Sequence, residues 1–318
     1  MRILIASAID PDSIERLSRD HEVTCAPGLS EEELLEMIPD KDVLVFRSGV
    51  SITREVLRVA RNLRLIVRAG SGLDNIDLDE LRRRNIVIVR IPRPSAQAVA
   101  ELTFTLMLGL ARNLLVADSE WRQGHWVKND LQNYLIHEKT LGVVGVGNIG
   151  QRVAEMGVAW GMRVIGCVHH WSRETSDRLE SLGIELRSFD EMLPEADFLT
   201  LHVPLYESTR HMVDADVLSR MKQGAYLVNV ARGGVVDETA LYDALTRGDR
   251  LRGAGLDVHA NEGHGKLSPF RELPNVILTP HVGASTVDTQ REIGREMLAI
   301  IKRFESETSN AEIAATGT

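Results

Sequence analysis

The chain consists of short apolar runs that alternate with longer amphipathic stretches, and this alternation occurs twice. The first hundred residues contain the Val-, Ile- and Leu-rich runs RILIAS, DVLVFRS, LRLIVRAG and NIVIVRI, separated by stretches such as SEEELLEMI and TREVLRVARN. The alternation restarts after residue 140 with TLGVVGVG, MRVIGCV, ADFLTLHVPL, GAYLVNVAR, RGAGLDV and NVILTPH. Strands that alternate with helices predict a parallel sheet covered by crossover helices. We therefore predict an α/β protein with two doubly wound parallel sheets.

Composition and charge restrict the class of protein. The chain has 37 Lys and Arg against 46 Asp and Glu, a formal net charge of -9, which argues against a nucleic-acid partner because phosphates are bound through excess cations. No run of about 18 apolar residues lacks a charge, and the N-terminal MRILIAS resembles a buried strand more than a signal peptide. We therefore expect a cytoplasmic protein without a membrane partner. Its two cysteines, Cys25 and Cys167, are too few for a disulfide framework or a Cys-rich metal site.

A glycine motif opens the second half of the chain. GVGNIG follows the apolar run TLGVV and precedes the helical stretch IGQRVAEMGVAW, which is the context of a dinucleotide-binding turn. Gly145 permits the tight turn, Gly147 lets the backbone approach a pyrophosphate, and Gly150 allows the helix to pack closely. Asn148 and Ile149 begin a helix whose unpaired N–H groups attract phosphate. These residues predict a site for NAD or NADP; the alternative is a glycine turn that binds no nucleotide.

The next strand ends without the acid that such sites usually carry. An Asp or Glu there would bind the ribose 2′-hydroxyl of NAD and repel the 2′-phosphate of NADP. The residues found at this place are Val168, His169, His170 and Arg173. Histidine and arginine side chains can donate hydrogen bonds to a phosphate, so we predict that the site accepts or prefers NADP. The alternative is a solvated loop around NAD, with Glu174 or Asp177 reaching the ribose.

Three later strands end in side chains that can take part in chemistry. NVARGG contributes Arg232, LDVHANEG contributes Asp257 and Glu262, and LTPHVGAS contributes His281. Ligands of open α/β sheets bind at the carboxyl ends of the strands. Reduction of a 2-oxo acid needs a cation for the carboxylate and a proton donor for the developing alkoxide, which Arg232 and His281 can supply. A carboxylate such as Glu262 favours the protonated form of a neighbouring histidine.

Taken together, these motifs resemble one known family. GVGNIG, LHVPL, NVARGGVVDETAL, GAGLDV and LTPHVGAST occur in the order and approximate spacing seen in the D-isomer-specific 2-hydroxyacid dehydrogenases, and the similarity covers residues 1 to about 304. We expect a flavodoxin-like substrate-binding domain of residues 1–96 plus 285–318. A Rossmann dinucleotide-binding domain is expected at 97–284, with a cleft between the two.

The resemblance implies a role for each motif residue. Arg232 corresponds to the arginine that binds the substrate carboxylate and carbonyl, and Glu262 to the glutamate that pairs with the catalytic histidine. His281 corresponds to that histidine, the general acid in reduction and the base in oxidation. Asp257 resembles the residue that contacts the nicotinamide end. Further residues expected to bind the cofactor are His202, Pro204 and Ala231.

The chain departs from the family pattern after Asp257, the aspartate of LDV. Where the family has a pattern like FxxEP, this chain reads HANEGHG, which places His259 and His264 near Glu262. We expect no metal in the protein. A metal site built from the two histidines stays open as an alternative, although no third ligand with suitable spacing stands out.

The first half resembles 3-phosphoglycerate dehydrogenases, through RAGSGLDNID and the long apolar helix that follows. The expected binding group for the substrate carboxylate is the backbone of Gly70, Ser71 and Gly72. Three arginines follow apolar strands and suggest a second anionic group, such as a phosphate or phosphonate: Arg47, Arg68 and Arg93. A surface salt bridge is the alternative role for Arg93. The chain reads PRPS where the family more often has APGAN, so the pocket is open to a substrate other than phosphoglycerate. Feedback inhibition by serine is not expected, because the regulatory domains of longer phosphoglycerate dehydrogenases are not seen in this sequence.

We thus predict an oxidoreductase that transfers a hydride between NAD(P) and a small anionic D-2-hydroxy acid. One alternative is an NADPH-dependent glyoxylate or hydroxypyruvate reductase, and another is a non-catalytic NAD(H)-sensing scaffold like a corepressor. The stretch SAQAVAELTFTLMLGLARNLLVADSEW is apolar nearly all round and is expected to join the two domains. We also expect a homodimer through the nucleotide-binding domain.

Overall fold

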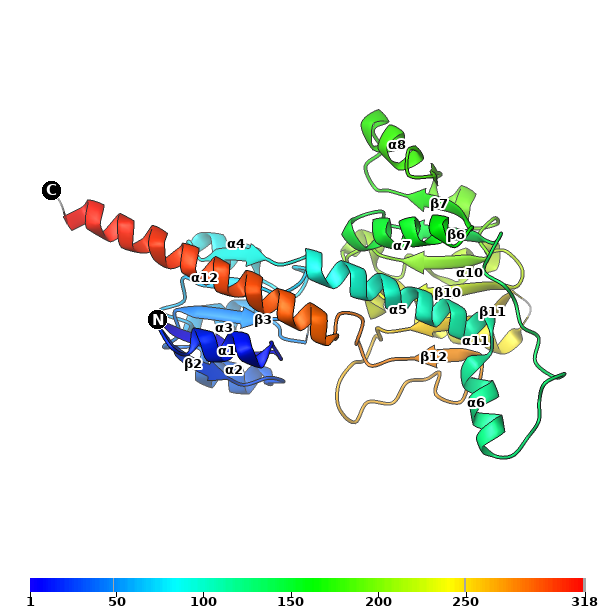
Figure 1. The fold of residues 1–318 in the computed structure, drawn as a ribbon, viewed down its shortest axis with the longest axis horizontal. Helices are drawn as coiled ribbons and strands as arrows, with labels where there is room; N and C mark the ends of the chain where they lie inside the picture. Colours follow the sequence, from blue (N-terminus) through cyan, green and yellow to red (C-terminus); the bar gives the residue numbers. More distant parts are fainter. Residues whose placement is uncertain (48, 249, 317–318) are drawn as a thin grey trace. The chain divides into compact units, whose positions relative to one another are not determined.

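The computed structural model describes residues 1–47, 49–248 and 250–316. The chain forms two compact units, each with its own sheet (Figure 1). The first contains residues 1–95 and the chain from Ser285 onward, and the second contains Ala96–Ala284. The predicted α/β class with two doubly wound parallel sheets is confirmed.

The first unit contains a five-stranded parallel sheet in the order β2-β1-β3-β4-β5, which is the strand order of flavodoxin. Its strands are β1 (Arg2–Ile5), β2 (Glu22–Cys25), β3 (Val43–Phe46), β4 (Leu65–Arg68) and β5 (Val87–Arg90). Its helices are α1 (Pro11–Leu17), α2 (Glu31–Met37), α3 (Arg54–Val59), α4 (Leu78–Arg83) and α12 (Val287–Thr316).

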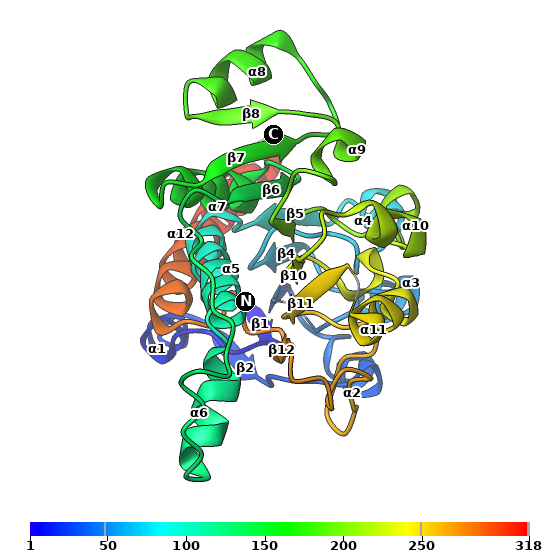
Figure 2. The same cartoon turned by 90° about the vertical axis from the view of Figure 1, so that its right-hand side faces the viewer.

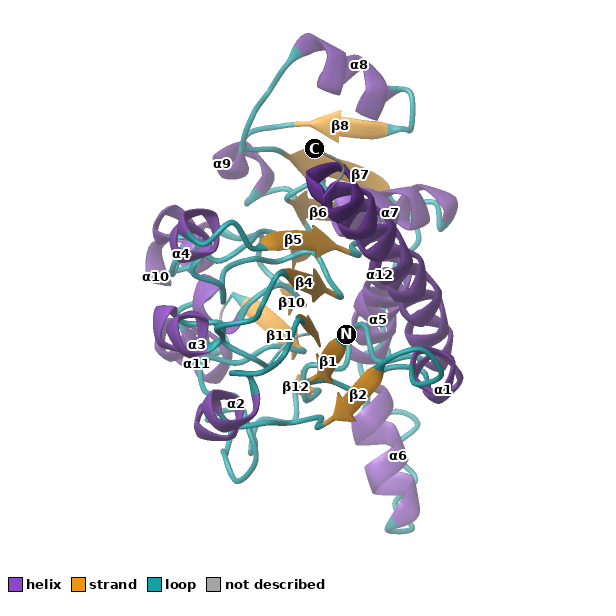
Figure 3. Ribbon diagram, turned by 90° about the vertical axis from the view of Figure 1, so that its left-hand side faces the viewer, coloured by secondary structure: helices purple, strands orange, loops and turns teal. Residues whose placement is uncertain are grey.

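Helices cover both faces of this sheet (Figure 3). On one face the buried side chains of α2, α3 and α4, including Leu34, Leu57 and Leu81, pack against the strands. On the other face α1 and α12 contribute buried residues such as Leu17 and Met297. Strands covered on both faces are expected to be apolar throughout, which explains runs such as VLVF in β3.

The second unit contains a seven-stranded parallel sheet in the order β12-β11-β10-β9-β6-β7-β8. Its strands are β6 (Thr140–Val144), β7 (Arg163–Cys167), β8 (Ile184–Leu186), β9 (Phe198–Leu201), β10 (Ala225–Asn229), β11 (Leu251–Leu256) and β12 (Val276–Leu278). The helices are α5 (Arg93–Ala111), α6 (Leu114–Arg122), α7 (Asn148–Ala159), α8 (Arg173–Glu180), α9 (Phe189–Met192), α10 (Ala215–Arg220) and α11 (Glu238–Arg247). The strand order reverses between β6 and β9, and ligands of such sheets bind at the reversal.

Two groups of helices enclose this second sheet. Helices α10 and α11 pack on one face through residues such as Leu218 and Leu241. Helices α5, α7 and α8 pack on the other through residues such as Phe104, Val153 and Leu179. Figure 2 shows β6, β7 and β8 in sequence, with α8 in the connection from β7 to β8.

The boundary between the units falls near the beginning of α5, the helix predicted to be apolar nearly all round. Asn113 has a left-handed backbone (φ 47°) and precedes α6, which is bent by 61° from α5. Among the described residues, no single helix combines the length and apolar character needed to span a membrane, and α5 with α6 reaches that threshold only as a pair. The apolar side chains exposed on α6 include Leu114, Leu115 and Trp121.

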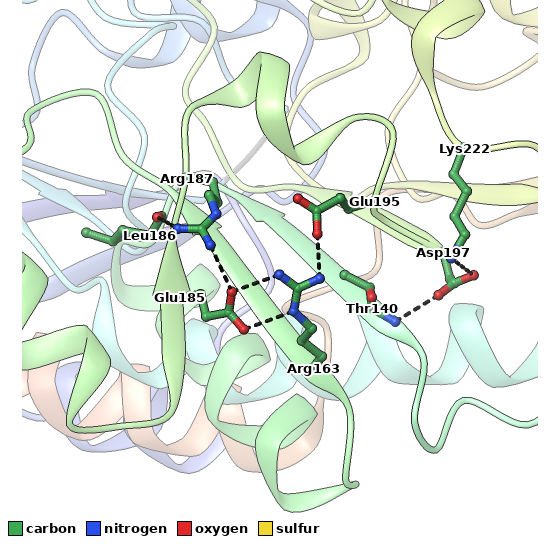
Figure 4. Close-up of polar contacts among 8 residues, drawn as sticks. All are labelled: Thr140, Arg163, Glu185, Leu186, Arg187, Glu195, Asp197 and Lys222. Atoms are coloured by element: carbon green, nitrogen blue, oxygen red, sulfur yellow. Dashed lines mark hydrogen bonds and ion pairs between the residues drawn. The ribbon is translucent and has the colours of Figure 1, made fainter.

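An ion-pair network ties together the amino ends of the strands in the second unit (Figure 4). Arg163 at the start of β7 donates to both carboxylate oxygens of Glu185 at 2.8 and 2.9 Å and also pairs with Glu195. The hydrogen bonds from Arg163 lower the pKa of Glu185, although burial acts in the opposite direction. Asp197 accepts a hydrogen bond from the Thr140 N–H. The ion pairs at this edge of the sheet hold neighbouring strands together. A ligand site is therefore sought at the carboxyl ends of the strands, where ligands of such sheets bind.

Candidate functional site

Glycine is required for steric reasons at two positions of the turn after β6. Gly145 has φ 93°, and a Cβ atom there would lie 2.8 Å from the carbonyl oxygen of His202. A Cβ atom on Gly150 would overlap the carbonyl oxygen of Gly145. At Gly147, by contrast, a Cβ atom would meet nothing within 4 Å. The turn is therefore tight where β6, β9 and α7 meet, and open at Gly147, where a ligand can approach the backbone.

Helix α7 begins without a side-chain cap. Its N-cap residue is Gly147, which has no side chain to accept the first N–H groups. At several other helices these groups are capped, for example by Asp10 at α1, Ser172 at α8 and Asp214 at α10. Uncapped N–H groups and the positive end of a helix dipole are suited to bind a phosphate. The turn therefore fits the pyrophosphate of a dinucleotide.

His202 lies at the carboxyl end of β9, with its backbone against Gly145. Its Nε2 lies 2.9 Å from the Thr200 hydroxyl, and its Nδ1 is buried without a partner among the described residues. Burial of the ring lowers the pKa of His202 to about 3, so the imidazole is neutral at physiological pH. Although the ring is buried, the His202 residue as a whole is partly exposed. A buried, unpartnered nitrogen beside the glycine turn is available to a bound group. Pro204 is exposed two residues further on, and Ala231 is buried.

The loop predicted to bind the ribose begins beside the glycine turn. The Gly145 N–H donates to the Cys167 carbonyl at 2.9 Å, so the end of β7 lies next to the turn. Val168 packs against the core. His169 and His170 are exposed with their ring centroids 4.4 Å apart. Arg173 is the first residue of α8 and is exposed, as is Glu174 in the same turn. This loop and the start of α8 therefore carry cations that suit NADP, His169, His170 and Arg173, and an acid that suits NAD, Glu174.

The structure pairs His281 with Glu262, and both belong to the second unit. Nδ1 of His281 lies 2.9 Å from one carboxylate oxygen of Glu262, and the other oxygen accepts the His259 N–H at 3.0 Å. Burial acts to raise the pKa of Glu262, but the hydrogen bonds from His281 and His259 outweigh it, and the net pKa is lowered. An ionised carboxylate only accepts, so Nδ1 of His281 carries a proton. Nε2 is left as the nitrogen that can exchange a proton with a substrate.

Asp257 anchors the segment that carries His281. It is 1% exposed, and its Oδ1 accepts from the Thr279 hydroxyl at 2.7 Å and from the Val282 N–H at 2.8 Å. Its Oδ2 accepts from the Gly283 N–H at 2.9 Å. The His281 N–H, in a left-handed residue (φ 54°), donates to the Asp257 carbonyl at 2.8 Å. The structure thus shows an anchoring role, and contact of Asp257 with a cofactor stays a prediction.

Arg232 follows β10 and is held by its neighbours. The Asn229 amide donates to the Arg232 carbonyl at 2.9 Å, and Nη1 of Arg232 donates to the Ala231 carbonyl at 2.7 Å. Gly233 lies so close to the backbone of His259 that a Cβ atom would overlap it. The loops after β10 and β11, which carry Arg232 and Glu262, are therefore adjacent.

The pair His281 and Glu262 lies in the wall of a cavity of about 580 Å³, which His259 and His264 also line. Nε2 of His259 contacts the Thr279 carbonyl at 3.0 Å, while its Nδ1 is buried without a partner among the described residues. Within the described part of the chain, no three His, Cys, Asp or Glu residues are grouped so as to hold a metal. The contacts of His259 with Glu262 and Thr279 are not visible in the sequence, because they depend on the fold of the loop.

The predicted substrate-binding residues of the first unit differ in their surroundings. Arg68 is 4% exposed and donates through Nε to the Gly72 carbonyl at 3.1 Å. Its guanidinium lies over the Phe46 ring and beneath Gly70. Arg68 therefore supports the turn of Gly70, Ser71 and Gly72 from behind, and direct contact with a substrate stays a prediction.

Arg47 and Arg93 are placed differently. Arg47 is half-buried, which lowers its pKa, and its N–H donates to the Ser7 hydroxyl at 2.9 Å. Arg93 is exposed at the start of α5, and its charge acts on Glu296 of α12. Arg90, which was not predicted as a site residue, ends β5 and donates to the Ser71 carbonyl at 3.3 Å. The sequence contains a signal for Arg90, because the β5 run VIVR ends in arginine just as the β4 run LIVR does.

Comparison with known proteins places these features in context. Residues 104–283 match the family described as "D-isomer specific 2-hydroxyacid dehydrogenase, NAD binding domain". The chain is 43% identical over 304 residues to a D-3-phosphoglycerate dehydrogenase of Methanocaldococcus jannaschii, covering 95% of this chain and 57% of that relative. It is 38% identical over 303 residues to a hydroxypyruvate reductase of Thermotoga maritima, covering 93% and 96%.

A solved structure shows the same fold. The D-lactate dehydrogenase from Aquifex aeolicus, complexed with NAD and lactic acid, superposes with a TM-score of 0.86 at 29% identity. The match covers 96% of both chains. The chain thus spans little more than half of one curated relative but nearly all of the other relative and of this structure.

Proposed function

Because the chain belongs to the D-isomer specific 2-hydroxyacid dehydrogenase family, we propose that it interconverts a small anionic D-2-hydroxy acid and its 2-oxo acid with NAD(P). The observation that carries this proposal is the ionised Glu262 hydrogen-bonded to Nδ1 of His281, which leaves Nε2 for proton transfer. A nicotinamide cofactor bound at the turn of Gly145 to Gly150 supplies or accepts the hydride. Residues 97–284 are proposed as the dinucleotide-binding domain, and 1–96 with 285–318 as the substrate-binding domain.

Each charged group has a proposed role. Arg232 binds the substrate carboxylate and orients the carbonyl through its planar guanidinium. His281 donates a proton from Nε2 to the carbonyl oxygen during reduction and accepts it during oxidation. Glu262 holds the imidazole in orientation and stabilises its charged form. Asp257 fixes the segment of His281 through its four hydrogen bonds, and contact with the nicotinamide end is its proposed second role.

The first unit is proposed to provide the specificity for the acid. The backbone of Gly70, Ser71 and Gly72 is proposed to bind the substrate carboxylate. The N–H groups of Ser71 and Gly72 would make the hydrogen bonds, because the Gly70 N–H donates to the Arg68 carbonyl at 2.8 Å. Arginines at the ends of β3 and β4 and the start of α5 favour a substrate with a second anionic group, such as a phosphate or phosphonate. A relative that is a D-3-phosphoglycerate dehydrogenase supports this choice.

A hydroxypyruvate or glyoxylate reductase that uses NADPH is the second candidate. Two observations favour it: the hydroxypyruvate reductase relative is covered over 96% of its length, and no acid ends β7. Reduction of hydroxypyruvate, its 3-phosphate and glyoxylate by the purified chain tests both candidates. Failure to turn over any 2-oxo acid or 2-hydroxy acid would contradict the proposed function and favour the non-catalytic scaffold.

The choice of cofactor is tested at Arg173. We propose that His169, His170 and Arg173 bind the 2′-phosphate of NADP, because all three are exposed at the end of β7 beside the glycine turn. Arg173→Gln is expected to weaken NADPH binding about 10-fold or more and to leave NADH binding within about twofold, since only NADPH loses a charge-assisted hydrogen bond. Tryptophan fluorescence quenching on titration with each cofactor measures both affinities.

The matched control for this experiment is Arg247→Gln. Arg247 pairs with Asp243 in the last turn of α11, which leads to the amino end of β11, so its loss removes the same charge away from the loop after β7. Equal effects of Arg173→Gln on both cofactors, or no effect on either, would mean that the loop does not read the 2′-phosphate. Tighter binding of NADH by the original chain would favour the alternative in which Glu174 or Asp177 binds the ribose.

We also propose that the chain forms a homodimer through its nucleotide-binding unit. Exposed apolar side chains gather on α6 and the loop that follows, including Leu115, Trp121, Trp126 and Leu135. Clusters of this kind favour a protein partner because they are costly to leave in water. Sedimentation velocity of the purified chain is expected to give a dimer at micromolar concentration, and a monomer at all concentrations would contradict it.

A further inference from the structure

We propose that Arg90 determines specificity by binding the second anionic group of the substrate. This inference rests on the proposed function but concerns a residue outside the groups assigned so far. Arg90 is the last residue of β5 and pairs in register with Arg68, the last residue of β4. The Ile91 N–H donates to the Arg68 carbonyl at 2.9 Å, so the end of β5 lies directly beside the turn that follows β4.

The turn of residues 70–72 is polarised by the two arginines. Arg68 binds the Gly72 carbonyl from the buried side, and Arg90 binds the Ser71 carbonyl from the exposed side. Within the described part of the chain, the N–H groups of Ser71 and Gly72 donate to no protein acceptor. Both carbonyl oxygens are therefore held by cations, while two N–H groups remain to bind an anion.

Arg90 has donors left over for a ligand. Its guanidinium carries five N–H groups and, toward the residues that the structure describes, makes one long hydrogen bond, 3.3 Å from Nη1 to the Ser71 carbonyl. Among the residues that the structure describes, no carboxylate pairs with Arg90, whereas Arg82 and Arg83 nearby in sequence pair with Asp79 and Glu80. The side chain is exposed, so an incoming phosphate can contact it without displacing an existing ion pair.

Two of the arginines predicted to bind the second anionic group are less suited to this task. Arg68 is buried beneath the turn, and Arg93 begins α5, where its charge acts on Glu296. In the proposed function, the turn binds the substrate carboxylate. A second anionic group then needs a cation beside the turn, and Arg90 has that position. A planar guanidinium can bind a phosphate through two parallel hydrogen bonds.

The experiment compares two substrates that differ only in the phosphate, hydroxypyruvate and 3-phosphohydroxypyruvate. The ratio of their kcat/KM values is measured for the original chain, Arg90→Gln, Arg90→Lys and the control Arg61→Gln. Arg61 is exposed in the turn before β4 at the opposite edge of the sheet. Arg90→Gln is expected to lower the preference for the phosphorylated substrate about 10- to 100-fold, as for loss of a charge-assisted contact. Arg90→Lys should restore part of the preference, and Arg61→Gln should leave it unchanged.

Other outcomes would overturn the proposal. Equal losses with both substrates would mean that Arg90 serves the shared carboxylate or only supports the turn, and unchanged ratios would mean that it has no role in specificity. Calorimetric titration with 3-phosphoglycerate and with D-glycerate needs no turnover. The titration therefore tests the role of Arg90 even if the chain reduces neither substrate. Failure to reduce either substrate would contradict the proposed function but not the role of Arg90 in binding. Thermal unfolding of each variant shows whether the fold is retained.

Discussion

Replacement of His281 by alanine is expected to lower kcat about 100-fold or more while the affinity for NAD(P)H is retained. The imidazole is the proton donor and acceptor of the proposed reaction, and loss of a general acid typically costs a factor of this size. The cofactor turn at Gly145 is formed by other segments of the unit, so its structure should not depend on the ring. Steady-state reduction of hydroxypyruvate measures kcat, and fluorescence titration measures the affinity.

Two further variants separate proton transfer from structure. Glu262→Gln keeps the size of the side chain but removes the charge that stabilises the imidazolium, and a fall in kcat of about 10-fold is expected. His264→Ala removes a histidine that lines the same cavity and, among the described residues, forms no hydrogen bond with His281 or Glu262, and near-normal turnover is expected. Near-normal turnover of the His281→Ala chain would contradict the assignment of the general acid.

Replacement of Gly147 by valine is expected to weaken NAD(P)H binding about 100-fold or more without loss of the fold. A Cβ atom at Gly147 meets no protein atom within 4 Å, so the folded chain can accommodate the side chain. The same space is where a pyrophosphate must approach the uncapped N–H groups of α7. Fluorescence titration with NADPH and NADH measures the loss, and thermal unfolding shows that the protein is still folded.

Gly150 provides the contrasting variant. A Cβ atom there would overlap the Gly145 carbonyl, so Gly150→Val is expected to lower the unfolding temperature as well as the affinity. If Gly147→Val bound both cofactors as tightly as the original chain, the turn after β6 would not be the pyrophosphate site. The dinucleotide assignment would then have to be abandoned, whatever the result at Gly150.

The reach of the sequence analysis differed between the two units. The glycine turn was predictable because its six-residue motif stands between an apolar strand and a helical stretch, although the close contact that requires glycine at Gly145 is with His202, far along the chain. Arg68 and Arg90 show the limit: both end an apolar strand, yet only Arg68 was predicted to bind substrate. The structure buries Arg68 under the turn and leaves Arg90 exposed beside it. Periodicity reports which face a residue lies on, but not how its long side chain turns at the end of a strand.

The pairing of His281 with Glu262 was inferred from a resemblance, and its support was invisible in the sequence. His259, Asp257 and Thr279 hold the two side chains through hydrogen bonds that span up to 26 positions of the chain. Such bonds depend on where β11 and β12 end, which is decided when the strands pair. Local patterns of apolar and polar residues carry no information about these distances.

The amino-acid sequence by itself determined the alternation of strands and helices, the α/β class and the position of the nucleotide-binding turn. These features follow from local propensities and from steric demands between near neighbours in the chain. Only the tertiary structure decided which arginine lies beneath the turn of Gly70 to Gly72 and which lies exposed beside it. It also decided which nitrogen of His281 faces Glu262. Both depend on packing between strands that are distant in sequence, because burial and hydrogen-bond geometry arise only when those strands come together.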